Sequence, residues 1–303
     1  MFDCVGLGIC AVDFICLLSE YPGLDEKIDA ETFSLQGGGP VPTALVTMAH
    51  FGAKTSYIGV VGDDEDGKFL LYEFSHAGVD TSATIIDKNG ITNRAFIWVD
   101  KKSGKKSIVL TQDRSSSPLI ADEVSRRHLM STKYMHIDGR ETQAVFPAVE
   151  FARENGVEVI LDAGSPRDRM DELLGLVDYP VVSEAFCRNY FGKGSYQNYL
   201  GILKDRGARY AVITCGERGS YAIDDGEIYH QPAFNVSVMD TTGAGDVFHG
   251  AFIYGLIQGW QLKEIMRFSA AAAALKCTKI GGRSGIPDLT MVNKLLSQKE
   301  KNE

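Results

Sequence analysis

The chain has 303 residues, of which 44% are hydrophobic and 23% are charged, a composition typical of a folded globular protein. Its formal charge of −9, without long runs of Lys or Arg, argues against nucleic acid as a partner. The apolar stretch 4–18 is interrupted by Asp13 and is too short to cross a bilayer, so no membrane association is expected. The six cysteines form no C-x-x-C pair, which indicates buried thiols and a cytoplasmic protein.

Short apolar runs alternate with longer helical patterns along most of the chain, which predicts a mainly parallel sheet covered by helices. The expected strands are residues 2–8, 55–61, 134–137, 158–162, 179–183 and 210–215. The expected helices are residues 41–51, 67–76, 143–155, 168–176, 196–205, 243–258 and 262–279.

Two stretches, residues 14–36 and 93–112, break this rhythm because they alternate like strands with no helix between them. They predict two hairpins of a small antiparallel sheet, the second with a turn at residues 101–104. The expected organisation is a Rossmann-like α/β domain of residues 1–13, 37–92 and 113–303, with residues 14–36 and 93–112 forming a β lid.

The sequence D-T-T-G-A-G-D at residues 240–246 opens a predicted helix. Its small residues leave the amides of the first helical turn open to an anion. Asp246 lies beside that anion site and is a candidate general base. The alternative is a structural strand-to-helix turn whose acid only balances the helix dipole.

This run, with a Gly38-Gly39 pair before a helix, resembles the signature of the ribokinase-like, or PfkB, family of carbohydrate kinases. The resemblance extends over roughly residues 2–287 and implies a ribokinase-type three-layer domain with a small β-sheet lid. It also implies an ATP-dependent sugar kinase with Asp246 as the base. The transferred phosphate would then be held by Gly243, Ala244 and Gly245.

The same resemblance implies further contacts. The sugar would be held by Asp13, Gly38, Gly39 and Thr43, where Thr43 replaces the usual Asn of the family. The nucleotide would lie along two loops, one with Thr214, Gly216 and Gly219, the other with Gly282 and Gly285. ATP, Mg²⁺ and a monovalent cation such as K⁺ are the implied cofactors, and a homodimer through the lid is the implied assembly. Residues 183–186 depart from the family's N-x-x-E element, so the magnesium ligands stay unassigned.

Within the family, three stretches resemble sulfofructose kinase, with ketohexokinase and fructokinase next. This likeness places Lys27 and Arg140 on a sulfonate, which needs fixed donors such as a guanidinium. The third expected contact, an asparagine, falls at residues 110–111, which are Leu and Thr here. Residues 136–140 also resemble ketohexokinase, which takes an uncharged ketose. A solvated lysine, a surface ion pair, and a kinase of ribose or a nucleoside remain the alternatives.

Three other interpretations compete with a sugar kinase. Residues 6–11 match the loose G-x-G-x-x-A pattern of nicotinamide-dependent dehydrogenases, but no convincing helix follows. Residues 62–69 imitate a P-loop, yet Phe69 replaces the Ser or Thr that binds magnesium, and four carboxylates would repel phosphate. A non-catalytic sugar sensor would have no need of Asp246.

Overall fold

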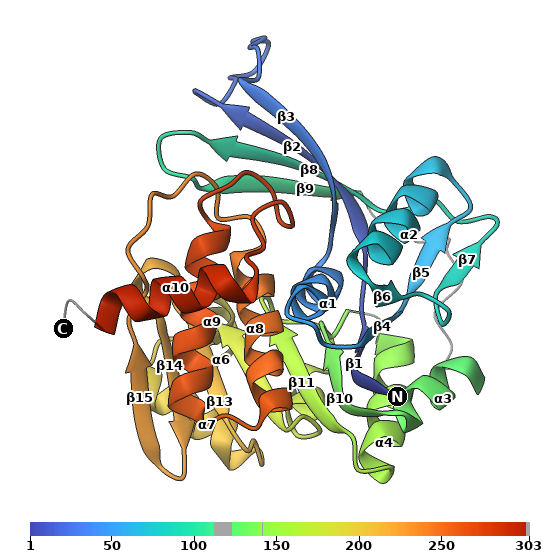
Figure 1. The fold of residues 1–303 in the computed structure, drawn as a ribbon, viewed down its shortest axis with the longest axis vertical. Coiled ribbons are helices and arrows are strands. Elements are labelled where there is room, and N and C mark those ends of the chain that lie inside the picture. The colour runs from blue at the N-terminus through green and yellow to red at the C-terminus, as the bar shows by residue number, and fades with distance from the viewer. Residues whose placement is uncertain (112–122, 141, 301–303) are drawn as a thin grey trace.

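The computed structural model describes residues 1–111, 123–140 and 142–300. Within them a nine-stranded sheet, in the order β15-β14-β13-β12-β11-β10-β1-β4-β6, forms the centre of a large α/β domain. A four-stranded sheet stands apart from it at the top of Figure 1. This arrangement confirms the predicted α/β class with a second, smaller sheet. The parts of the predicted domain and lid at residues 112–122, 141 and 301–303 lie outside the described residues.

The large sheet is mixed. Its strands run parallel from β13 to β6, while β14 and β15 are antiparallel. The run predicted at residues 55–61 is divided between β4 and β5, and β5 pairs with β7 outside the large sheet. The strands are β1 (Phe2–Leu7), β4 (Thr55–Ile58), β5 (Val60–Gly62), β6 (Val79–Asp80), β7 (Ile85–Asp87), β10 (Thr132–Ile137), β11 (Glu158–Ala163), β12 (Tyr179–Ser183), β13 (Ala211–Thr214), β14 (Ser220–Asp224) and β15 (Glu227–Gln231).

Helices cover both faces of this sheet, each layer with its own apolar cluster. One layer contains α1 (Pro40–His50), α2 (Glu65–Ala77), α8 (Ala244–Gln258), α9 (Leu262–Lys276) and α10 (Leu289–Glu300). The other contains α3 (Glu123–Met130), α4 (Thr142–Glu154), α5 (Met170–Leu174), α6 (Glu184–Phe191) and α7 (Tyr196–Asp205). Helix α8 is buried along most of its length because it is enclosed by the sheet, α1 and α9. No helix in the described ranges is long and apolar enough to span a membrane.

The small sheet contains β3 (Thr32–Gly38), β2 (Ala11–Leu18), β8 (Arg94–Asp100) and β9 (Lys106–Thr111), in that order. Each predicted hairpin is antiparallel, but β2 and β8 pair in parallel, so the prediction of an antiparallel sheet is wrong. The reason is topological: both first strands leave the large domain in the same direction and lie side by side. β2 and β3 also extend beyond the predicted limits of 14–36. The lid as a separate domain stays a prediction.

The two faces of the small sheet differ. Side chains alternate along β8, so Ala95, Ile97 and Val99 are buried, whereas Phe96 and Trp98 are 39% and 40% exposed. The buried set packs with Ile15, Leu17 and Ile280, and Asp13 has the same parity along β2. The inner face therefore carries Asp13 toward the large domain. The outer face is defined by Phe14, Cys16, Phe33, Leu35, Phe96 and Trp98.

Candidate functional site

The candidate site lies at the carboxyl edge of the parallel strands. Leu7 of β1, Ile137 of β10 and Leu161 of β11 are in register. The residues that follow them, Gly8, Asp138 and Asp162, therefore lie in a row at this edge. Ligands in open α/β sheets bind at such an edge. Two of the three residues are acids, so this edge of the sheet carries neighbouring carboxyl groups.

Asp240 fixes the turn at residues 240–246. It is fully buried, and its Oδ1 accepts hydrogen bonds from the backbone N and the Oγ1 of Thr242, each at 2.7 Å. Its Oδ2 accepts from the backbone N of Gly281 at 2.7 Å, and its carbonyl accepts from Nζ of Lys276 at 2.8 Å. Asp240 thus joins this turn to the loop of residues 281–285. Sequence reasoning missed Lys276, whose one signal was a lysine ending an apolar helix.

The small residues of the turn serve two different purposes. Gly243 has φ 75°, and a Cβ there would lie 2.7 Å from Cα of Gly282, so the two loops touch at their backbones. A Cβ on Gly245 would meet nothing within 4 Å. Helix α8 begins at Ala244, which directs its first amides to this open space. The geometry fits an anion such as a phosphate group.

Asp246 lies in the first turn of α8. Burial, followed by the negative charge of Asp162, raises the pKa of Asp246 to about 6. His249, Lys106 and Lys276 act in the opposite direction through their positive charge. The carboxyl group is therefore ionised at neutral pH yet basic enough to accept a proton, as a general base requires.

Asp13 faces the same space from the lid. Burial raises the pKa of Asp13 to about 7, opposed by the Arg283 guanidinium and increased by the charge of Asp246. A Cβ on Gly38 would lie 2.1 Å from Oδ1 of Asp13, so only glycine leaves room for this carboxyl group. The structure thus brings together four of the predicted positions: Asp13, Gly38, Gly282 and Asp246.

Arg283 ties the loop of residues 281–285 to the lid, and sequence reasoning missed its role. Its Nη1 lies 3.1 Å from Oε2 of Glu73, and its backbone N donates to Oε1 of Gln36 at 2.9 Å. The guanidinium is buried and lies 5.1 Å from the ring centroid of Phe74. This loop is consequently attached both to the turn, through Asp240, and to strand β3.

The hairpin between β8 and β9 also contacts the turn. The carbonyl of Gly104 accepts from the backbone N and Oγ1 of Thr241, at 3.2 and 3.0 Å. Lys106 donates from Nζ to the Thr241 carbonyl at 3.1 Å. The predicted turn at residues 101–104 therefore holds the small sheet against the turn at residues 240–246. Lys106 also brings a positive charge close to Asp246.

The remaining residues predicted on the sugar side lie around the ends of β1 and β10. Gly39 has φ 104° and its backbone is packed against Ile9, while Thr43 is buried in the first turn of α1. The backbone N of Arg140 donates to Oδ1 of Asp138 at 3.0 Å. The chain passes from β1 directly into β2, so the helix that a dinucleotide site needs does not follow residues 6–11. The dehydrogenase interpretation is wrong on this point.

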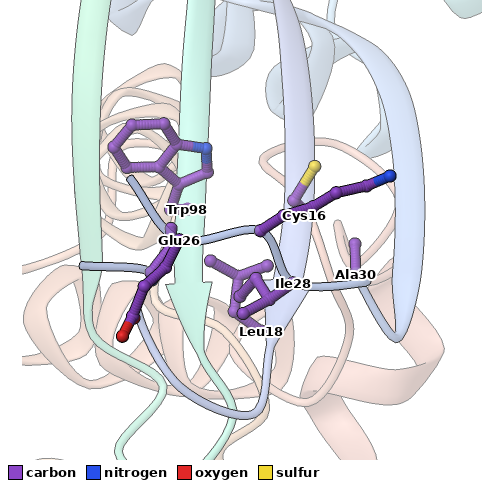
Figure 2. A pocket seen from close by; sticks show the side chains of 8 residues that line it. Cys16, Leu18, Glu26, Ile28, Ala30 and Trp98 are labelled. Atoms are coloured by element: carbon purple, nitrogen blue, oxygen red, sulfur yellow. The ribbon is translucent and has the colours of Figure 1, made fainter. Parts of the chain in front are cut away.

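Other predicted positions lie away from the turn. Lys27 is exposed in the loop between β2 and β3 and lines a pocket with Cys16, Leu18 and Trp98. Figure 2 shows Cys16 and Trp98 at this pocket on neighbouring strands. These side chains belong to the outer face of the lid, so Lys27 and Asp13 lie on opposite faces.

The first predicted nucleotide loop follows β13. Thr214 ends this strand, a short 3₁₀ helix spans Gly216–Arg218, and Gly219 has φ 86°. Arg218 forms an ion pair with Glu184 of α6. In the second loop, a Cβ on Gly285 would lie 2.4 Å from the Lys276 carbonyl. Among the described contacts, none joins the first loop directly to the second.

Residues 183–186 do not form the acid-containing element expected in the family. Ser183 caps α6 by accepting from the backbone N of Phe186 at 2.9 Å, and Phe186 is 0% exposed. Glu184 is already bound to Arg188, Arg218 and Tyr196. The described residues contain no cluster of three or more His, Cys, Asp or Glu suited to a metal ion. The magnesium ligands therefore stay unassigned.

Comparison with known proteins gives a consistent result. A family model described as pfkB family carbohydrate kinase matches residues 1–289. Ribokinase of Haemophilus influenzae is 29% identical over 288 residues, which are 93% of this chain and 94% of that protein. The 5-dehydro-2-deoxygluconokinase of Bacillus subtilis is 26% identical, covering 97% of this chain and 96% of that protein.

Solved structures agree along the whole chain. A putative ribokinase from Agrobacterium tumefaciens has a TM-score of 0.91 at 25% identity, covering 100% of this chain and 99% of that one. A putative ribokinase II from E. coli, in complex with ATP and Mg²⁺, has a TM-score of 0.86 at 20% identity, covering 98% of this chain and 100% of that one. The predicted ribokinase-type fold is therefore confirmed.

The burial of Phe186 predicts that the missing acid cannot simply be restored. Phe186→Glu should lower the free energy of unfolding by about 3–5 kcal/mol, because ring packing is lost and a carboxyl group is buried. Ala185→Glu is the matched control: position 185 is exposed in the first turn of α6, so a change within about 0.5 kcal/mol is expected. Urea unfolding measures the free energy of unfolding of each variant. Equal stability of the two variants would contradict this account.

Proposed function

Because the chain belongs to the pfkB family of carbohydrate kinases, we propose that it transfers the γ-phosphoryl group of ATP to a hydroxyl group of a sugar held between Asp13 and Asp246. One observation carries this proposal: a carboxyl group with a raised pKa adjoins the open amides at the start of α8. Asp13 faces the same place from the lid. A sensor without catalysis would not need such a base.

In this mechanism Asp246 takes the proton of the acceptor hydroxyl. The hydroxyl oxygen bonds to the γ-phosphorus while the bond from that phosphorus to the ADP oxygen breaks. The amides of residues 243–245 stabilise the charge on the transferred group. Asp13 orients the sugar through its hydroxyls. Magnesium, which accompanies ATP in the E. coli structure, would neutralise phosphate charge when bound. The proposal also includes a monovalent cation such as K⁺, bound near the loop of residues 281–285. The lid excludes water, which would otherwise compete as an acceptor.

Removal of the base should abolish most turnover. Asp246→Asn should reduce kcat by roughly 10²- to 10⁴-fold, because the acceptor proton loses its acceptor. In the unmutated enzyme kcat/KM should fall as the pH drops from about 7 through about 6, where first Asp13 and then Asp246 become protonated. Steady-state kinetics with the sugar that the enzyme phosphorylates measure catalysis, and calorimetry with ATP measures nucleotide binding. Near-normal turnover in a folded Asp246→Asn protein would rule out this role.

The anion site gives a second prediction. Gly245→Val should fold normally, because a side chain there enters open space. That space is where the transferred phosphate is expected, so kcat should fall by at least about 100-fold, as for a lost oxyanion donor. Sugar binding, measured by calorimetry, should change little. Unchanged kinetics in this variant would contradict the assignment.

The acceptor is proposed to be an anionic ketose, with sulfofructose as the first candidate. Arg140 and Arg167 lie close enough that burial and the positive charge of Arg140 lower the pKa of Arg167. Among the described residues neither guanidinium forms an ion pair with an acid. Two positive groups that influence each other in this way, with Asp138 acting on Arg167 in the opposite direction, suit a sulfonate or carboxylate. The relatives named 5-dehydro-2-deoxygluconokinase indicate a sugar acid. The alternative is ribose or another uncharged sugar or a nucleoside, as for the relatives named ribokinase.

The position of Lys27 favours a contribution to this anion site from a second copy. It lies on the outer face of the lid, opposite to Asp13. That face exposes Phe33 (58%), Leu35 (41%) and Trp98 (40%), an apolar surface of the kind that partner subunits cover. We therefore propose a homodimer in which the lid of each copy reaches toward the partner's sugar.

Substrate charge and assembly can be tested together. Arg140→Met should raise KM for 6-deoxy-6-sulfofructose about tenfold or more, because a hydrogen bond to a charged group is lost, and change KM for fructose little. A mixture of Lys27→Met and Arg140→Met proteins should recover activity, since one site of each heterodimer has both groups. Equal efficiency of the unmutated enzyme on the two sugars would refute the anionic substrate. If the protein is shown to dimerise through the lid and the mixture still recovers no activity, Lys27 does not bind the substrate anion.

A further inference from the structure

His249 occupies an unusual place one turn after Asp246. It lies on α8, is 3% exposed, and both of its ring nitrogens face backbone carbonyl oxygens. Nδ1 is 2.7 Å from the Gly245 carbonyl oxygen, and Nε2 is 3.0 Å from that of Val181. Carbonyl oxygens only accept hydrogen bonds. A neutral imidazole carries one N–H and would direct its lone pair at one of them, so only the imidazolium satisfies both contacts.

A counter-ion is present beside the ring. Oδ2 of Asp162, at the end of β11, lies 3.4 Å from Nδ1 of His249. Both side chains are nearly buried, with 4% and 11% of their surfaces exposed. A buried charge is tolerated when it is paired and hydrogen-bonded, and both conditions hold here. The pair therefore places a compensated positive charge directly beneath the turn of residues 243–246.

The other ionisable groups around this pair are arranged consistently with it. His136 of β10 stacks on His249 with a centroid distance of 5.8 Å. Burial, then the charge of His249, lowers the pKa of His136 to about 3, so this neighbour is neutral. Burial and the charge of Asp162 raise the pKa of Asp246, whereas His249, Lys106 of β9 and Lys276 of α9 lower it. Burial likewise raises the pKa of Asp162, whereas His249 and Arg140 lower it. Asp13 of β2 faces Asp246, whose charge raises the pKa of Asp13.

We propose that His249 is held as an imidazolium and is a positioning residue for the catalytic base. It fixes the carbonyl of Gly245 in the anion-binding turn. It also cancels the negative charge of Asp162, which would otherwise oppose ionisation of Asp246. The consequence for catalysis rests on the proposed kinase function, whereas the protonation state of His249 does not.

The protonation state is tested first, without any substrate. In ¹⁵N-edited spectra of histidine side chains, the signals absent from His249→Asn identify His249. At pH 7 both of its ring nitrogens should give the signals of N–H groups, because both face carbonyl oxygens. A neutral tautomer at pH 7 in the unmutated protein would overturn the inference, whether or not the protein is a kinase.

The pH profile of kcat/KM then tests the positioning role. His249→Asn should move the acid limb upward by about one pH unit, because the uncompensated charge of Asp162 makes Asp246 harder to ionise. His249→Asn combined with Asp162→Asn should return the limb close to its original position, since both charges are removed. His136→Gln, which removes a neutral buried histidine from the same stack, is the matched control and should leave the limb unchanged.

A structural role alone would lower activity at every pH and would not be corrected by the second substitution. An unshifted limb in active His249→Asn protein, or a double variant no better than the single one, would therefore overturn the positioning role. If His249→Asn does not fold, substitution of each of the other five histidines in turn assigns the His249 signals by elimination, and the spectra of the unmutated protein then decide the charge of the ring. Absence of kinase activity with every sugar would refute the proposed function and leave the spectroscopic result valid.

Discussion

The site depends on the carboxylate of Asp240. Both of its oxygens accept backbone amides from separate segments, Thr242 in the turn and Gly281 in the following loop. Without this link the first amides of α8 would have no fixed relation to the segment that approaches Gly243 from the other side. Lys276 adds a buried cation under the same residue. A buried carboxylate with several charge-assisted hydrogen bonds is a rigid support. Asp240, the first acid of the 240–246 turn, is therefore structural, whereas Asp246, the last, is the proposed base.

Charge compensation is the second constraint on this site. Acids at positions 13, 138, 162, 240 and 246 converge on one edge of the sheet, and burial raises the pKa of several of them. Such a group of like charges is stable only with buried cations among them. Arg283 and Lys276 supply two of these cations, and His249 is proposed as a third. Asp246 can thus remain ionised at neutral pH among these acids.

The sequence predicted the α/β class and the acid-bearing turn because each follows from local pattern: alternation, helix periodicity and a glycine-rich helix start. It missed α3, α6 and α10, which are short or largely polar on one side. It also missed Arg283, His249 and Lys276, since their partners lie far along the chain, as with Glu73, 210 residues from Arg283. The parallel pairing of β2 with β8 could not be predicted either, because these strands are far apart in the sequence. Local pattern does not specify which distant segments meet.

The contacts of the lid suggest how closure and assembly of the site are coupled. Gly104 and Lys106 bind Thr241, so the β8–β9 hairpin is attached to the anion-binding turn. On the other edge, Gln36 of β3 binds the backbone of Arg283. Both attachments join at Asp240, which holds the turn and the second loop together. Any movement of the lid would therefore disturb the two segments proposed to hold phosphate and nucleotide. In the proposed mechanism, closure of the small sheet and formation of the phosphate site would then be one event, because the same hydrogen bonds serve both.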